Sequence, residues 1–114
     1  MKARRYAVAS AIALFGFGAL FMALPGRGAG LKVQIQGFHY NPSTITVRAG
    51  EAATFYNRTK RTHTATCPAC GVDSGDIQPE AFRTLTFPKA GRFQLFCRYH
   101  AQSNSMIAVV VVKP

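Results

Sequence analysis

The chain has 114 residues, which is the length of one domain rather than two. Fourteen Lys or Arg against four Asp or Glu give a net charge of +10, which favours acidic partners or anionic membrane surfaces. A domain this small has a marginal core that a metal or a disulfide would help to hold, and it leaves little room for a substrate cleft beside a second catalytic centre.

Residues 1–30 have the pattern of an export segment. A basic N-terminus precedes the stretch 7–24, which carries no charge. The pattern predicts an apolar helix that is either a secretory signal peptide, cleaved after the small residues before Leu31, or an uncleaved membrane anchor, because the stretch approaches bilayer length. In both cases residues 31–114 are expected in the periplasm or on the outer face of the membrane, with membrane contact only through an uncleaved N-terminus.

The expected exported domain, residues 31–114, is also basic. It holds ten Lys or Arg and four Asp or Glu, a net charge of about +6. Nucleic acid is the usual partner of a basic chain, but export would separate this domain from it. The basic residues are scattered, and only Arg58, Lys60 and Arg61 lie close together in sequence. The charge therefore favours steering toward an acidic protein surface.

From Leu31 onward the hydrophobic pattern is that of β-strands, and no stretch after residue 30 has helical periodicity. Residues 67–80 are rich in Pro, Gly, Asp and Ser, which predicts a loop with at most a brief helical turn. Residues 107–112 form a continuous apolar run, typical of a strand buried between two sheets. Seven short strands with turns between them predict an all-β antiparallel sandwich. The predicted strands are 31–36, 44–48, 52–57, 62–66, 82–87, 93–97 and 107–112.

Four residues form a candidate metal site: His63, Cys97, His100 and Met106. Cys97 ends a predicted strand, His100 follows three residues later, and Met106 lies where the chain enters the last strand. Each alone is commonly structural, but their joint occurrence is specific, because Met106 is the only Met outside the export segment. A thiolate, two imidazoles and a weak thioether are the ligands of a type 1 (blue) copper ion that transfers electrons.

The spacing of several motifs resembles that of a known family. They lie in the segments 37–42, 45–50, 54–57, 63–64, 73–75, 82–87, 90–93 and 96–100. With these segments, the sequence resembles the plastocyanin and amicyanin group of cupredoxins across residues 33–112. The resemblance implies a Greek-key β-sandwich with one copper ion at one end, His63 as first ligand, Cys97 as thiolate, His100 as second imidazole and Met106 as axial thioether.

The sequence departs from that family at two places. Five residues separate His100 from Met106, more than is usual, and Ser105 stands where Gly commonly precedes the Met. Gln102 or a backbone carbonyl therefore competes with Met106 as the weak axial donor. Thr64 stands where many relatives have Asn, so we expect a different hydrogen bond to the thiolate. His39 is interpreted as structural or exposed, because the family has no ligand there.

Cys67 and Cys70 are not part of the family pattern. Their spacing in an oxidising compartment favours a short-loop disulfide, and the family's use of Cys97 alone for copper agrees with that prediction. A second metal site and a redox-active dithiol are the two alternatives. A c-type haem is disfavoured, because Gly71 rather than His follows Cys70.

Four functions compete. The favoured one is an electron carrier, a monomer that exchanges single electrons with redox partner proteins and is not an enzyme. The alternative is a copper-handling protein that binds and delivers copper through the same site and the Cys67–Cys70 loop. A copper enzyme is disfavoured because only His39 is left for a further copper centre, and a binuclear centre would need a second Cys beside Cys97. A metal-free immunoglobulin-like adhesion domain is the structural alternative.

Overall fold

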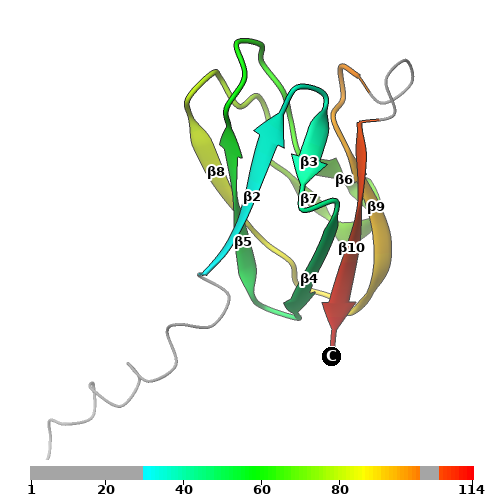
Figure 1. Cartoon of the computed structure of the whole chain (residues 1–114). Helices are drawn as coiled ribbons and strands as arrows, with labels where there is room; N and C mark the ends of the chain where they lie inside the picture. The colour runs from blue at the N-terminus through cyan, green and yellow to red at the C-terminus, as the bar shows by residue number, and fades with distance from the viewer. Residues whose placement is uncertain (1–29, 101–105) are drawn as a thin grey trace, which may run out of the picture.

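The computed structural model describes residues 30–100 and 106–114, which form a sandwich of two β-sheets (Figure 1). One sheet has the strand order β3-β2-β5-β8, and the other β4-β10-β9-β6-β7. The strands are β2 (Leu31–Gln36), β3 (His39–Asn41), β4 (Thr44–Arg48), β5 (Ala52–Asn57), β6 (Thr66–Cys67), β7 (Val72–Asp73), β8 (Phe82–Thr86), β9 (Gly91–Phe96) and β10 (Ile107–Lys113), with one 3-10 turn, η1 (Pro68–Cys70). The all-β sandwich prediction is confirmed.

The predicted export helix and its cleavage position concern residues 1–29, which lie outside the described residues. Between residues 30 and 100 and from 106 to 114, no helix has the length and apolar character needed to cross a bilayer.

The core follows from alternation of apolar residues along the strands. In β2, Val33 and Ile35 are fully buried while their neighbours point outward, and in β5 Ala53 and Phe55 are buried in the same way. Successive side chains of a strand point to opposite faces, so each sheet turns one apolar face toward the other. Tyr40 and Phe55 meet edge to face in this core, with ring centroids 6.2 Å apart.

Four details differ from the prediction. The sandwich was predicted to be antiparallel, but β2 pairs with β5, and β4 with β10, in parallel, because the chain changes sheets before it returns beside these strands. The strand expected at 62–66 begins only at Thr66, because His63 makes a single bridge with Ile77 before the chain joins the second sheet. The two- and three-residue strands β7 and β3 were not predicted, since such short strands carry too few residues to show alternation. The apolar run of β10 alternates between buried and half-buried residues, so only one face is in the core.

Two connections at the same end of the sandwich position the candidate site. One follows β5 and contains residues 58–65, and the other follows β9 and starts with Cys97. In Figure 1, β5 and β9 end, and β10 begins, at the end of the sandwich opposite the C-terminus. Residues that are more than thirty positions apart in sequence therefore meet at one end of the molecule.

Candidate metal centre

The structure brings His63, Cys97 and His100 together. The Sγ atom of Cys97 lies 3.7 Å from Nδ1 of His63 and 3.4 Å from Nδ1 of His100. The ligand atoms of the three residues all lie within 4.8 Å of one another. In both imidazoles the nitrogen that faces the sulfur is Nδ1. One small ion placed between these atoms would be held by one sulfur and two nitrogens.

His63 is the buried imidazole of the site. Its backbone pairs with Ile77 in both directions, at 3.2 and 2.7 Å, and its side chain has no exposed surface. Burial, together with smaller contributions from the nearby His100 and Arg61 side chains, lowers the pKa of His63 to about 4. The ring is therefore neutral at pH 7, which is the state that binds a metal. Its Nε2 has no hydrogen-bond partner among the described residues.

His100 is the half-buried imidazole of the site. Its backbone N–H donates to the carbonyl oxygen of Cys97 at 3.1 Å, which curls the chain so that both side chains face one point. The Phe38 ring packs edge to face with the imidazole, with ring centroids 4.8 Å apart, and the centroid of the His63 ring lies 4.9 Å from that of His100. Phe38 thus covers part of the site, and His100 is its most accessible imidazole.

Met106 lies beside this group without exposed surface. Its carbonyl oxygen accepts the backbone N–H of Cys97 at 3.2 Å, which fixes the start of β10 next to the thiol. Gln102, the predicted competitor for the axial position, and Ser105 lie outside the described residues. His39, predicted to be structural or exposed, is an exposed residue of strand β3.

Thr64 connects the two ligand segments. Its backbone N–H donates to Sγ of Cys97 at 3.4 Å, a bond that stabilises negative charge on the sulfur. Its hydroxyl accepts the backbone N–H of Arg98 at 2.9 Å. The Thr64 side chain thus contacts the backbone of Arg98, the residue after Cys97, whereas the Thr64 backbone contacts the Cys97 sulfur itself.

Asn57 is a supporting residue that the sequence analysis did not single out. It is fully buried, and its Nδ2 donates to the carbonyl oxygens of Arg61 and Ile77 at 2.7 and 2.8 Å. Its Oδ1 accepts the backbone N–H and the hydroxyl of Thr59. The sequence does indicate that Asn57 is buried, because the alternation that buries Ala53 and Phe55 also places this polar residue on the core face of β5.

Cys67 and Cys70 form the predicted disulfide, and Cys97 is the free cysteine. The disulfide closes the 3-10 turn between β6 and β7, and both cysteines are buried. The disulfide prediction is therefore confirmed. The alternatives of a dithiol and of a second metal site both need free thiolates, which the disulfide does not provide.

Comparison with known families decides the classification. A family described as a cupredoxin-like domain matches residues 9–112. The chain belongs to the cupredoxin-like domain family. No curated protein matches its sequence.

Solved structures of amicyanin variants share the fold. The oxidised form of a methionine-to-leucine mutant of amicyanin has a TM-score of 0.64 and 23% identity, over 75% of this chain and 83% of that one. The Cu(I) form of a methionine-to-alanine mutant has a TM-score of 0.63 and 23% identity, over 76% and 90% of the two chains. These values support the cupredoxin sandwich, which agrees with the predicted family resemblance.

The residues present fit one type 1 copper ion. The family membership and the donor set agree, because a thiolate and two imidazoles, with a thioether nearby, suit both copper oxidation states. The thiol is buried and lies close to one nitrogen of each of two imidazoles, which is the environment that a copper–thiolate bond needs. The cofactor prediction is confirmed to this extent.

Proposed function

We propose that this protein is an exported electron carrier that holds one type 1 copper ion through His63, Cys97 and His100, with Met106 as the weak axial donor. The observation that carries the proposal is the convergence of Cys97 Sγ with the two Nδ1 atoms within 4.8 Å. When bound, copper supplies the reversible one-electron change, and the thiolate and imidazoles supply a donor set that tolerates both oxidation states.

The chain's own residues hold these donors in place before copper binds. Cys97 is fixed through its backbone N–H to Met106, and its sulfur accepts the N–H of Thr64. His63 is fixed by its bridge to Ile77. Donors held by a rigid β frame move little on oxidation or reduction, so electron transfer requires little rearrangement. Because His100 is half-buried, an electron would pass between the copper ion and the protein surface through this residue, and we call His100 the proposed exit route.

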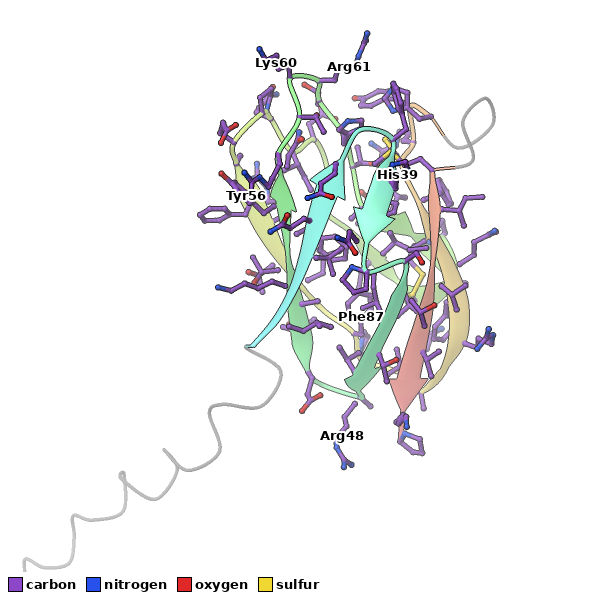
Figure 2. All side chains as sticks on the ribbon, in the orientation of Figure 1. His39, Arg48, Tyr56, Lys60, Arg61 and Phe87 are labelled. Atoms are coloured by element: carbon purple, nitrogen blue, oxygen red, sulfur yellow. A yellow bond between two sulfur atoms is a disulfide. The ribbon has the colours of Figure 1, made fainter. Side chains whose placement is uncertain are left out.

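A basic surface near the site supports docking to an acidic redox partner. Lys60 and Arg61 project from the end of the sandwich opposite to Arg48 (Figure 2). The guanidinium of Arg61 lies 6.0 Å from the centre of the Phe38 ring, and that ring packs against His100. Positive charge thus lies next to the proposed exit route, where it would steer an acidic partner in the periplasm toward the site.

Two observations favour a carrier over the alternatives. Within residues 30–100 and 106–114, one group of three or more His, Cys or acidic residues could hold a metal, and His39 is not in it. A copper enzyme would need a further centre. The disulfide between Cys67 and Cys70 occupies the thiols that a copper-delivery route would use. Delivery of copper is therefore the second candidate, and the test below separates the two.

The test is titration of the copper-free protein with Cu(II), followed by reduction and reoxidation. An electron carrier should bind one equivalent, accept and return one electron without losing the metal, and hold Cu(I) and Cu(II) against a chelator. A copper-handling protein should instead release the metal readily in one oxidation state or pass it to an acceptor chelator. A protein that binds no copper would overturn both proposals.

A further inference from the structure

The two residues between Cys97 and His100 are both held by acidic side chains from one short segment. Arg98 forms an ion pair with Asp73, and the Tyr99 hydroxyl donates to Oδ1 of Asp76 at 2.6 Å. Arg98 and Tyr99 do not belong to the group of metal donors. Their side chains instead connect the ligand segment to residues 73–76.

The Arg98 contact is part of a closed ring of hydrogen bonds. The backbone N–H of Arg98 donates to the Thr64 hydroxyl at 2.9 Å, and the hydroxyls of Thr64 and Thr66 lie 2.8 Å apart. The Thr66 hydroxyl donates to Oδ1 of Asp73 at 3.1 Å, and Oδ2 of Asp73 accepts from the guanidinium of Arg98. The ring begins and ends at Arg98, the residue next to Cys97.

The direction of each bond follows from the donors available. An ionised carboxylate only accepts, so the single proton of the Thr66 hydroxyl points to Asp73. The Thr64 hydroxyl must then donate to Thr66, which leaves its own lone pairs for the N–H of Arg98. Every donor in the ring has one acceptor, and hydrogen bonds in such chains strengthen one another.

The disulfide explains why Thr66 and Asp73 keep their positions. They are paired in register across strands β6 and β7, and the Cys67–Cys70 bond closes the turn between those strands. Gly71 turns the chain with φ of 78°, in the left-handed region that glycine tolerates. The Cys67–Cys70 disulfide, which lies outside the family pattern, thus fixes the hairpin that presents Thr66 and Asp73.

We propose that Asp73 and Asp76 are positioning residues that hold the Cys97–His100 segment through Arg98 and Tyr99. We call this arrangement the acidic clamp: Asp73, Asp76, Arg98, Tyr99 and the bridging hydroxyl of Thr66. Its effect on the metal rests on the proposed copper-carrier function, whereas its effect on the segment itself does not. The clamp fixes the spacing of the thiol and the second imidazole before the metal binds.

The expected effects are moderate. Asp73 and Arg98 are both partly exposed, with 43% and 45% of their side-chain surfaces accessible, and single exposed pairs contribute little. The ring and the short Tyr99–Asp76 bond add to that pair. Loss of one member should therefore change local opening or copper release by roughly two- to fivefold, the range that corresponds to contacts of this strength.

The first experiment uses the copper-free protein and measures amide hydrogen exchange at Arg98 and His100, whose N–H groups donate to Thr64 and Cys97. Tyr99→Phe removes one hydroxyl without changing charge. Tyr56→Phe is the matched control, because the Tyr56 hydroxyl, on strand β5 of the other sheet, donates to Glu80 at 2.8 Å. We expect roughly two- to fivefold faster exchange in Tyr99→Phe and no change at these two amides in Tyr56→Phe.

Thr66→Val provides a second variant that opens the ring, again without a change in charge. Its control is Thr54→Val, since Thr54 makes a hydroxyl pair with Thr84 at 2.9 Å in the other sheet. The double variant Asp76→Ala with Tyr99→Phe should exchange no faster than either single variant, because both substitutions remove the same bond. Wild-type exchange at Arg98 and His100 in both Tyr99→Phe and Thr66→Val would overturn the clamp.

The second experiment uses the Cu(II)-loaded protein and records the copper electron paramagnetic resonance spectrum and the rate of copper release to a chelator. Tyr99→Phe and Thr66→Val should shift the copper hyperfine splitting and speed release roughly two- to fivefold, while Tyr56→Phe and Thr54→Val leave both unchanged. Unchanged spectra and release in both clamp variants would show that the clamp does not position the ligands. If the wild-type protein takes up no copper, the proposed function is wrong. The hydrogen-exchange experiment on the copper-free protein would still show whether the acidic clamp holds the Cys97–His100 segment.

Discussion

The Nδ2 group of Asn57 donates to the carbonyl oxygen of Arg61 at 2.7 Å, across the turn that leads to His63. The same amide donates to Ile77, the residue that pairs with the His63 backbone, and its oxygen accepts two bonds from Thr59. One buried side chain therefore holds both the turn that leads to His63 and the residue that pairs with the His63 backbone.

Asn57→Ala should destabilise the protein by about 1–3 kcal/mol, because it removes four hydrogen bonds made by a fully buried side chain. Urea unfolding of the copper-free protein measures this change. Gln36→Ala is the control, since the exposed Gln36 side chain donates to the Gln34 side chain at 2.8 Å, and it should change stability by less than about 0.5 kcal/mol. Equal effects of the two substitutions would show that the Asn57 network does not stabilise the turn.

The two candidate histidines should differ in their response to added imidazole. His63 has no exposed surface, whereas His100 is half-buried. In Cu(II)-loaded His100→Gly, imidazole from solution can reach the gap and restore the visible absorption. In His63→Gly the gap is enclosed, so imidazole should restore much less. The comparison is a titration of both variants with imidazole, and stronger restoration in His63→Gly would contradict the geometry.

Two roles of Met106 can be tested separately, since its backbone carbonyl accepts from Cys97 and its fully buried side chain is the proposed axial donor. Met106→Leu keeps the backbone bond and the volume but removes the thioether. The blue or green colour should persist and the reduction potential should rise, by on the order of 60 mV for a tenfold preference, because loss of an axial donor favours Cu(I). Voltammetry of the two proteins measures the shift. An unchanged spectrum and an unchanged potential would show that Met106 packs in the core and is not a copper ligand.

Much of the fold and the donor set could be predicted from the sequence, for physical reasons. The alternation in 31–36 and 52–57 specifies half-buried strands, and Cys97-x-x-His100 needs only one turn of chain to converge. The closed ring through Thr66, Asp73 and Arg98 could not be predicted, because it joins side chains brought together only by tertiary structure. The short strands β3 and β7 could not be predicted for the same reason. They form because their residues pair with neighbouring strands, and their own composition does not indicate a strand.

Charge near the site should control electron exchange with small charged complexes. Lys60→Glu reverses one charge beside the proposed exit route, and Lys113→Glu makes the same change on the strand pair that contains Arg48, at the opposite end. Reduction of an anionic iron cyanide complex by the copper-loaded protein should slow in Lys60→Glu and change little in Lys113→Glu. The wild-type rate should fall as salt is added. Rates that are independent of salt would show that the basic cluster does not steer partners.

The central claim is a copper–thiolate bond at Cys97, and the visible absorption of the Cu(II)-loaded protein tests it most directly. Cys97 is the free cysteine of the chain, so it alone can give the intense thiolate-to-copper charge transfer of this site. The account predicts a blue or green wild type with one copper per chain and a Cys97→Ala variant without that absorption. A colourless wild type, or a Cys97→Ala variant that keeps the colour, would contradict it.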